Sequence, residues 1–380
     1  MISATSSILQ PVPAERRGNE TPQQFVYGRA PLLIYWESTR ACDLACVHCR
    51  AMAVSRRHPQ ELRTDEVVNL LEQIVRFGAP HPGASLPHLI ITGGDPLQRP
   101  DLIPLIQYAT MLKIPVSVTP AGTTRLTPDA IAELKAAGTL GLGLSLDGPD
   151  AERHDAFRGE DGSFNWTISA ALAARRQGMP LQINTMVTAE TLHDIPEIFQ
   201  VVQELEVTRW ALFFLIKTGR GEGLSEITPE ESERFLNWLW RTSAQAPFPI
   251  KTTEAHHYRR IAYLKLRSQG LSDEEICRTP AGRGFGIRDG NGILFISHTG
   301  NIYPSGFLPK SAGNVRHQDV VDVYRYSDLF RRIRDVNQLQ GKCGRCEFRA
   351  ICGGSRARAF SATGDPMAAD PLCPYIPRQR

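Results

Sequence analysis

The hydrophobic positions between residues 31 and 243 follow two alternating periods. Short continuous apolar runs, typical of strands buried on both faces, are each followed by a segment with apolar residues at helical spacing. Six such runs occur, at residues 32–36, 88–92, 116–119, 142–146, 181–187 and 210–216. Strands that alternate with helices predict an α/β fold with a parallel sheet covered by helices. Ligands of such a fold bind at the carboxyl ends of the strands.

Polar residues mark where several of these helices begin. Thr64 is expected to cap the first helix, with Asp65 and Glu66 in its first turn. Thr127 and Thr228 each precede a proline, which favours the first position of a helix. These signals divide the alternating region into strand and helix units of ordinary length.

The pattern changes at both ends of the chain. Residues 1–30 contain proline and glycine among polar residues without a sustained period, which predicts a flexible N-terminal arm. After residue 243 the alternation stops, and residues 293–297 and 301–303 predict a β-hairpin. We therefore expect an arm at 1–30, a helix-covered sheet at 31–243 and a small α+β extension at 244–380.

Composition narrows the class of protein. Hydrophobic residues make up 42% and charged residues 22% of the 380 residues, as in ordinary globular enzymes. The net charge of +3 gives no reason to expect nucleic acid or a membrane surface as a partner. The chain has no apolar run of about 18 residues and no signal peptide, so we expect a cytoplasmic protein.

Three of the eight cysteines, Cys42, Cys46 and Cys49, lie within eight residues directly after the first predicted strand. Three thiolates on one loop can hold three corners of a cubane iron–sulfur cluster and leave the fourth iron open to a small molecule. The alternatives are structural zinc, which requires four ligands, and buried cysteines without a metal. The crowding of three cysteines in one polar loop favours the cluster.

A second set of cysteines lies in the C-terminal extension. Cys343, Cys346, Cys352 and Cys373 offer four thiolates, which suit a second cubane or a four-cysteine zinc site equally well. The remaining Cys277 stands alone. It is a candidate for a buried thiol or for a loosely held ligand of a substrate or cluster.

The cysteine loop, with the spacing Cys-x3-Cys-x2-Cys and His48 before the last cysteine, resembles that of the radical S-adenosylmethionine (SAM) enzymes. This resemblance implies a partial (β/α)6 barrel. It also implies that the open iron of a 4Fe-4S cluster binds SAM, which one electron cleaves to a 5′-deoxyadenosyl radical. His48 would lie against the adenine, because a fourth protein ligand would block SAM.

A second stretch, Gly93-Gly94-Asp95-Pro96, is similar to the Gly-Gly-Glu-Pro loop of that family. The resemblance implies that the two glycines let the backbone approach the methionine amino group of SAM. Asp95 departs from the family glutamate by one methylene, which puts a side-chain role there in doubt.

Further positions match the ends of the family's strands. Ser145 would point at the ribose or carboxylate of SAM, Arg158 would pair with its carboxylate, and Asn184 would bind a ribose hydroxyl. Asp147 either belongs to this set or opens a turn with the glycine and proline after it. The full set of expected cofactor-binding residues is Tyr35, His48, Gly93, Gly94, Asp95, Ser145, Asp147, Arg158 and Asn184. Residues 214–217 would lie along the adenine.

The C-terminal extension resembles the SPASM and Twitch extensions of radical SAM enzymes. Two cysteines of the full SPASM pattern are absent, because Ser305 and Arg356 stand at their positions. The resemblance therefore implies one auxiliary 4Fe-4S cluster on the second cysteine set, with Cys277 as the only plausible remnant of another. A cluster with four protein ligands would carry electrons.

Residues 35–42 and 352–359 look most like the radical SAM enzymes that form heme by decarboxylation or make precursors of d-type heme. This implies a tetrapyrrole substrate and an electron donor such as flavodoxin or ferredoxin. Arg356 and Arg358 would pair either with substrate carboxylates or with the protein's own carbonyls and acids. The alternatives are a maturase that modifies a precursor peptide and an iron–sulfur electron-transfer or sensor protein without SAM chemistry.

Overall fold

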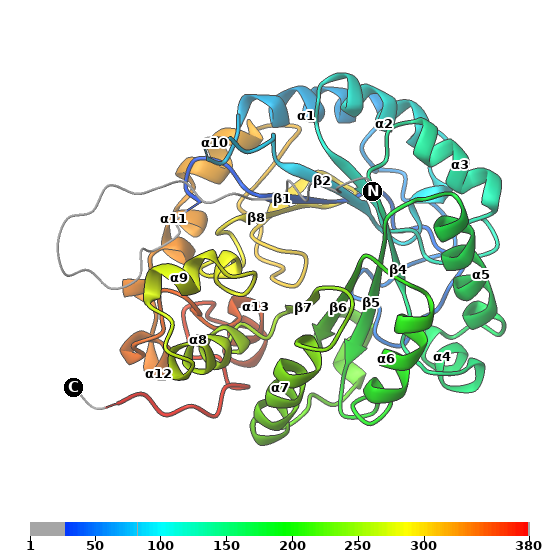
Figure 1. Cartoon of the computed structure of the whole chain (residues 1–380). Coiled ribbons are helices and arrows are strands. Elements are labelled where there is room, and N and C mark those ends of the chain that lie inside the picture. Colours follow the sequence, from blue (N-terminus) through cyan, green and yellow to red (C-terminus); the bar gives the residue numbers. More distant parts are fainter. Residues whose placement is uncertain (1–26, 82, 379–380) are drawn as a thin grey trace.

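The computed structural model describes residues 27–81 and 83–378, which contain one mixed sheet (Figure 1). Its strand order is β10-β9-β8-β1-β2-β3-β4-β5-β6-β7. The strands are β1 (Leu33–Glu37), β2 (His88–Thr92), β3 (Val116–Val118), β4 (Leu142–Ser145), β5 (Leu181–Val187), β6 (Arg209–Phe214), β7 (Ile250–Thr253), β8 (Ile293–Ile296), β9 (Asn301–Tyr303) and β10 (Gly313–Asn314). The six predicted strands are thus confirmed as β1 to β6, which pair in parallel in chain order.

The sheet is curved into a partial barrel, and helices cover its outer face (Figure 1). They are α1 (Thr64–Arg76), α2 (Leu102–Met111), α3 (Pro128–Ala136), α4 (Ala151–Arg158), α5 (Ser163–Arg176), α6 (Ile195–Glu204), α7 (Pro229–Ser243), α8 (Tyr258–Ser268), α9 (Asp273–Arg278), α10 (Val320–Tyr326), α11 (Asp328–Arg334), α12 (Gly341–Arg345) and α13 (Arg356–Thr363). Single 3-10 turns are η1 (Pro96–Gln98), η2 (Gly219–Gly223), η3 (Gly282–Gly284) and η4 (Val336–Gln338). The predicted fold class, a partial α/β barrel with a C-terminal extension, is confirmed.

The expectation that the sheet stops before residue 244 is wrong. β7 pairs in parallel with β6, and β8 pairs in parallel with β1, so both edges of the six-stranded core are extended. The predicted hairpin exists as β8 and β9, but it forms part of the barrel wall. The division of the chain into domains at residue 243 stays a prediction.

The C-terminal helices fill the opening between the two edges of the sheet. Figure 1 shows α8, α12 and α13 between the β7 edge and the β8 side. Arg358 in α13 donates from Nη1 to the carbonyl of Glu254 at 2.6 Å and from Nη2 to that of Leu215 at 2.8 Å. These bonds attach the extension to the segments that follow β7 and β6.

The two faces of the barrel wall differ in burial. Along β5, Leu181, Ile183, Thr185 and Val187 are buried under the helices, whereas Gln182, Asn184 and Met186 between them are partly accessible. The accessible residues face the inside of the barrel, because successive side chains of a strand point to opposite faces. The barrel therefore encloses a lumen that solvent reaches.

The helix-start signals are confirmed at two of three positions. Thr127 Oγ1 accepts from the N–H of Ala130 at 3.1 Å, and Thr228 forms a capping box with Glu231. Thr64 is not a cap, and this prediction is wrong. Arg63 is the cap, since its N–H donates to the Glu66 carboxylate at 2.8 Å, and Thr64 instead donates to Asp101.

The predicted N-terminal arm lies almost entirely outside the described residues. Its last residues are held in place, because Tyr27 donates its N–H to Asn291 and accepts at its carbonyl from the Tyr324 hydroxyl. In the described part of the chain no helix has the length and apolar character needed to cross a bilayer.

Candidate functional site

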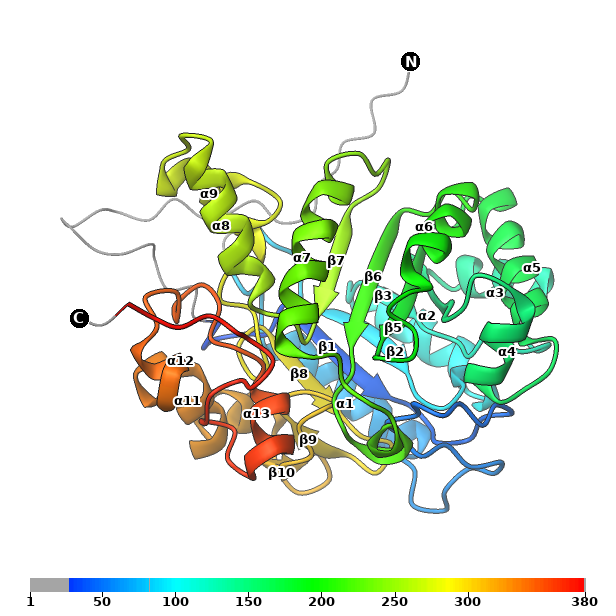
Figure 2. The ribbon, with the colours of Figure 1, turned by 90° about the horizontal axis from the view of Figure 1, so that it is seen from below.

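The cysteine loop lies at the carboxyl end of β1, the end to which the parallel strands run (Figure 2). Cys42 and Cys46 are buried and Cys49 is partly accessible, and none of the three forms a disulfide. The N–H of Cys42 donates to the carbonyl of Val54 at 2.9 Å, which closes the loop at its base. The three thiols pack in a small cluster with Leu44 and neighbours that include Ala121.

At Gly93 and Gly94, the backbone after β2 lies in close contact with the start of this loop. A Cβ on Gly94 would lie 2.4 Å from the carbonyl oxygen of Ala41, and one on Gly93 would lie 2.5 Å from that of Thr39. The N–H of Gly94 donates to the same Thr39 carbonyl at 2.7 Å. The glycines are needed for this backbone contact, which fixes where the cysteine loop begins.

Asp95 has a structural role that the sequence left in doubt. The buried carboxylate accepts from the N–H of Leu97 at 3.1 Å, from that of Ala121 at 3.4 Å and from the hydroxyl of Thr123 at 3.1 Å. Burial raises the pKa of Asp95, and these hydrogen bonds oppose that rise. The side chain of Asp95, one methylene shorter than glutamate, therefore connects the loop after β2 to the segment after β3 through hydrogen bonds.

Arg158, at the end of α4, brings a buried positive charge to the cysteine loop. Its Nη1 lies 3.3 Å from the carboxylate of Asp147 and 3.5 Å from Nε2 of His48, and its Nη2 donates to the carbonyl of Ala121 at 3.3 Å. Burial raises the pKa of the Cys46 thiol, whereas the charge of Arg158 lowers it. A cation at this position stabilises thiolates and is suited to a ligand carboxylate.

Asp147 does more than open a turn. Its Oδ1 accepts from the N–H of Met186 on β5 at 2.7 Å, and its Oδ2 accepts from Arg158. Its own N–H donates to Nδ1 of His154 at 3.1 Å. Asp147 therefore orients Arg158 from the end of β4.

His48 stacks on Phe157, with ring centroids 4.7 Å apart and planes 17° from parallel. Burial lowers the pKa of His48 to about 4, so the ring is neutral near pH 7. Its buried Nδ1 has no hydrogen-bond partner among the described residues. Because a buried polar nitrogen normally has a partner, this atom is free to bond to a ligand beside the cysteine loop.

Ser145 and Asn184 lie side by side on the inner face of the barrel, since they pair in register between β4 and β5. Tyr35 stands apart from the group at the cysteine loop. It lies on the inner wall with Ile90 and Phe295 as its strand neighbours. The structure thus gathers most of the expected residues at the cysteine loop, and these are His48, Gly93, Gly94, Asp95, Asp147 and Arg158. It places Ser145, Asn184 and Tyr35 on the inner wall of the barrel.

The expectation for residues 214–217 is wrong for the side chain of Phe214. Phe214 points outward and packs against Phe235 of α7, with centroids 5.9 Å apart, so its ring cannot lie along a ligand inside the barrel. Alternation along the strand gives the inner position to Phe213 instead.

Arg220 was missed by the sequence reasoning. Its Nε donates to the carbonyl of Cys46 at 2.9 Å, its Nη1 donates to that of Ala53 at 3.2 Å, and its N–H donates to that of Cys49 at 3.1 Å. This arginine holds the loop from the end of β6. Its only sequence signal was a position between two glycines directly after a predicted strand.

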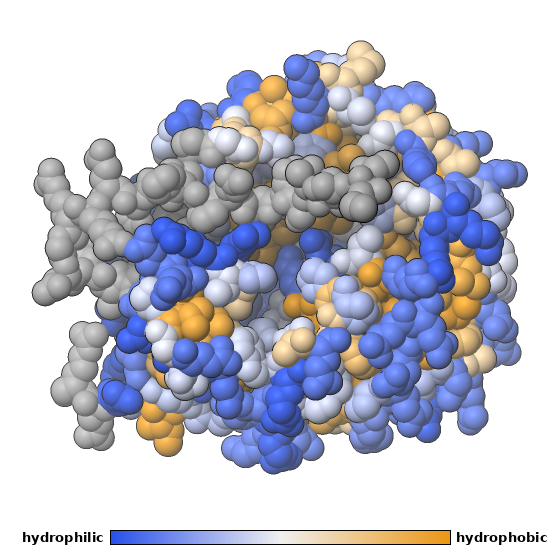
Figure 3. Space-filling view, in the orientation of Figure 1, coloured by the Kyte–Doolittle hydropathy of each residue, from blue (hydrophilic) through white to orange (hydrophobic). Residues whose placement is uncertain are grey.

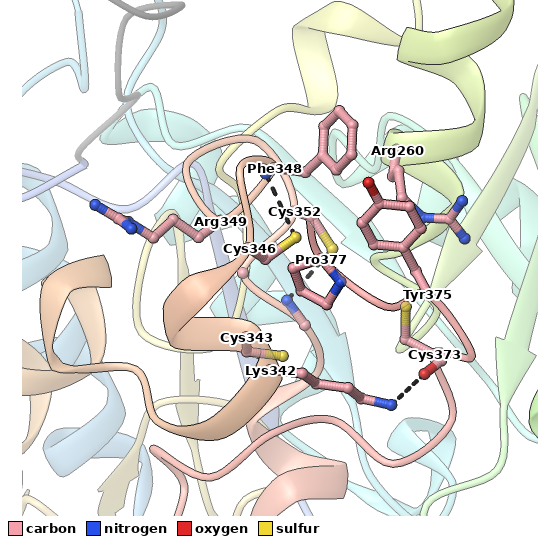
Figure 4. Close-up of a pocket in the computed structure, with 12 residues that line it drawn as sticks. Arg260, Lys342, Cys343, Cys346, Phe348, Arg349, Cys352, Cys373, Tyr375 and Pro377 are labelled. Atoms are coloured by element: carbon pink, nitrogen blue, oxygen red, sulfur yellow. Dashed lines mark hydrogen bonds between the residues drawn. The ribbon is translucent and has the colours of Figure 1, made fainter. Parts of the chain in front are cut away.

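The second cysteine set lines a small cavity of about 30 Å³ (Figure 4). Cys343 lies in α12, Cys346 follows it, Cys352 precedes α13 and Cys373 lies near the end of the chain. Positive side chains share the lining, and they are Arg260, Lys342 and Arg349. Burial raises the pKa of Cys373 to about 11, and the charges of Arg260 and Lys342 oppose this rise.

Three of these sulfurs accept hydrogen bonds from the backbone. The N–H groups of Phe348, Gly354 and Asp370 donate to Cys346, Cys352 and Cys343, each at 3.4 Å. Such bonds stabilise sulfur with thiolate character, as in cluster ligands. Cys277 is not among the residues that line this cavity, and it packs in an apolar cluster with Ile276 and Phe285.

Arg356 and Arg358 serve the protein rather than a substrate. Both are buried, and Arg356 donates to the carbonyls of Pro366 at 2.8 Å and Ala368 at 2.7 Å. Arg358 donates to the carbonyls of Glu254 and Leu215. Of the two roles that the sequence left open, the structure supports the internal one.

The model of the radical SAM superfamily matches residues 36–202. The chain is 37% identical to the AdoMet-dependent heme synthase of Methanosarcina barkeri, over 92% of this chain and 98% of that protein. It is 40% identical to the AdoMet-dependent heme synthase of Nitratidesulfovibrio vulgaris, over 91% and 93%. Among solved structures, Streptococcus suis SuiB bound to precursor peptide SuiA is similar with a TM-score of 0.69 and 20% identity, over 91% of this chain and 76% of that one.

Proposed function

Since the chain belongs to the radical SAM superfamily, we propose that it converts propionate side chains of an iron tetrapyrrole to vinyl groups by oxidative decarboxylation. The family implies a 4Fe-4S cluster and SAM, which when bound supply a 5′-deoxyadenosyl radical. The observation that carries the reaction class is the convergence of Arg158, Asp147 and His48 on the cysteine loop. The likeness to two heme synthases over more than nine-tenths of the chain supports the substrate class.

The reaction balances without an added oxidant. One electron and SAM give methionine and a radical that takes one hydrogen atom from the propionate chain. The substrate radical then loses CO₂ and one electron and becomes a vinyl group. The electron that starts each cycle is therefore recovered at its end, and a route for that electron is required.

The residues at the cysteine loop and on the inner wall have distinct roles in this proposal. Cys42, Cys46 and Cys49 hold the cluster, and Arg158 pairs with the SAM carboxylate while Asp147 keeps its guanidinium in place. Ser145 and Asn184, which are neighbours on the inner wall, bind the ribose. Tyr35 contacts the substrate rather than SAM, because it lies away from the cysteine loop.

An auxiliary 4Fe-4S cluster on Cys343, Cys346, Cys352 and Cys373 would receive the electron. In residues 27–81 and 83–378 no three His, Cys, Asp or Glu side chains converge as ligands of a single metal ion. A zinc ion would need four sulfurs about 2.3 Å from one centre. The resemblance of this extension to the SPASM and Twitch extensions supports a cubane in preference to zinc.

The test is an anaerobic assay of the reconstituted protein with dithionite, SAM and iron-coproporphyrin, followed by mass spectrometry. We expect 5′-deoxyadenosine and a product that has lost CO₂ and two hydrogens at a side chain. A parallel reaction with a small peptide encoded beside the gene tests the maturase alternative. Modification of the peptide alone would overturn the proposed substrate. No 5′-deoxyadenosine above background, with both clusters intact, would overturn the reaction class.

A further inference from the structure

Basic side chains gather at the end of the lumen opposite the cysteine loop. Arg209 is the first residue of β6, Lys251 is the second residue of β7, and Arg259 lies in the first turn of α8. Figure 1 looks at this end, where the strands begin, and Figure 3 shows its surface in the same orientation. Strands β6 and β7 run away from it toward the end of the barrel where the cysteine loop lies, here called the cofactor end (Figure 2).

The strand register places Arg209 and Lys251 on the inner wall. Lys251 pairs with Ala211, two residues after Arg209, so both side chains share a face of the sheet. The outer face is occupied by Trp210, which is fully buried against Phe199. Arg209 Nη1 donates to Oε1 of Gln182, another inner residue, at 3.4 Å. Both cations are nevertheless exposed to solvent, since the lumen is open.

Among the described residues, neither Arg209, Lys251 nor Arg259 forms an ion pair with an acid. Two acids, Glu254 and Asp289, oppose the charge of Arg259. Burial and the charge of Asp289 raise the pKa of Glu254 well above its usual value, so Glu254 contributes little negative charge.

Two further groups that face Arg209 are uncharged near pH 7. Burial, with the charges of Arg209 and Lys251, lowers the pKa of His88 on β2 to about 4. Burial raises the pKa of Tyr35 on β1 to about 12. In the described part of the chain, Arg209 and Lys251 therefore have no carboxylate as an ion-pair partner at this end of the lumen.

Aromatic side chains line the wall between this base and the cofactor end. Phe213 lies on the inner face of β6, and Phe307 lies 6.5 Å from it between ring centroids. On the opposite wall, the rings of Phe295 and Tyr303 are 6.1 Å apart. From Arg209 to Phe213 the strand rises about 13 Å, which is comparable with the breadth of a tetrapyrrole. Aromatic walls with a cationic base match a flat macrocycle with carboxylate arms.

We propose that Arg209 and Lys251 bind the propionate groups that are not reacting, and so aim the reacting side chain at the cysteine loop. This inference rests on the proposed function and names the specificity residues of the substrate site. Charge-assisted hydrogen bonds from arginine and lysine to carboxylates are the strongest contacts available there. Arg259 is left out of the test, because it also donates to the carbonyl of Cys352 at 3.5 Å.

The experiment measures anaerobic binding of iron-coproporphyrin by absorbance titration. We expect Arg209→Met and Lys251→Met each to weaken binding about tenfold, and the double variant to weaken it further. Lys251→Arg should keep most of the affinity. The matched control is Arg176→Met, an exposed arginine at the end of α5.

A second probe, the tetramethyl ester of iron-coproporphyrin, separates carboxylate recognition from altered shape. Wild type and double variant should bind the ester equally, and substrate-free cleavage of SAM should be unchanged in both. If the double variant binds the free acid as tightly as wild type, the inference is overturned while the proposed function stands. If both probes lose affinity equally, the residues are structural and the inference is again overturned. If wild type binds neither probe, the proposed function fails and the inference with it.

Discussion

At the scale of single residues, the cofactor end depends on a few buried polar side chains with several partners each. Arg158 contacts His48, Asp147 and the backbone of Ala121. Asp147 in turn bonds to the backbone of β5. A substitution of Arg158 or Asp147 should therefore affect both the binding of SAM and the hydrogen bonds that hold the neighbouring side chains in place.

Arg158→Gln should raise the SAM concentration that gives half-maximal 5′-deoxyadenosine formation by at least about tenfold. A neutral amide cannot replace the charged guanidinium that pairs with the SAM carboxylate. Arg158→Lys should recover part of the loss. Arg153→Gln on the same helix is the control, since Arg153 is half-exposed and pairs with Asp194 at the surface. An unchanged SAM dependence in Arg158→Gln would remove this residue from the cofactor site.

His154 should make the fold sensitive to acid. Burial lowers its pKa to about 4, and its Nδ1 must stay unprotonated to accept from the N–H of Asp147. The unfolded chain therefore binds this proton first, at its ordinary pKa near 6.5. The free energy of unfolding should fall as the pH drops from about 6.5 toward 4, by up to about 1.4 kcal/mol per pH unit from this group.

Urea unfolding at several pH values, with iron content measured in parallel, checks that expectation. His154→Gln should show a smaller loss of stability between pH 7 and pH 5 than wild type at equal iron content. Equal slopes would mean that His154 is protonated alike in the folded and unfolded chains.

At the scale of elements, three parts of the chain hold the cysteine loop in place. They are the loop after β2, helix α4 and the 3-10 turn η2. The glycines after β2 allow backbone contact, the N–H of Val47 donates to the carbonyl of Phe157 at 3.1 Å, and Arg220 binds from η2. These contacts fix the position of the loop relative to the strand ends.

Gly94→Ala should displace this loop, since the added Cβ would meet backbone 2.4 Å away. We expect a loss of about 1–3 kcal/mol in stability and a lower iron content after reconstitution. Gly284→Ala is the matched control, because its Cβ would meet open space. Full iron content in Gly94→Ala would show that the contact is dispensable.

The elements also show what sequence alone can predict. The six strands of the core were predicted, because each is a continuous apolar run. β7 was missed, since Lys251 interrupts its apolar character by facing the lumen. The pairing of β8 with β1 joins residues about 260 positions apart, and no local pattern encodes it. Arg220 was missed for the same reason, because its partners are distant in the sequence.

At the scale of the whole molecule, the two cysteine sets lie on one continuous sheet and its extension. α13 bonds to the ends of β6 and β7, so the second set has a fixed place relative to the barrel. The proposed route for an electron between the two sets requires such a fixed place.

The two sets should therefore respond differently to substitution. Cys46→Ser should abolish SAM cleavage, whereas Cys343→Ser should retain some cleavage while turnover of the tetrapyrrole stops. Iron content and 5′-deoxyadenosine are measured in both variants. Equal loss of cleavage in both would argue that the second set has a purely structural role.

The central claim is that a radical formed at the cysteine loop takes hydrogen from a tetrapyrrole propionate. The most direct test is transfer of deuterium from iron-coproporphyrin labelled on its propionate chains to 5′-deoxyadenosine, measured by mass spectrometry. We predict deuterium in the 5′-deoxyadenosine of wild type and no 5′-deoxyadenosine with Cys46→Ser. Unlabelled 5′-deoxyadenosine formed while the labelled substrate stays intact would contradict the claim.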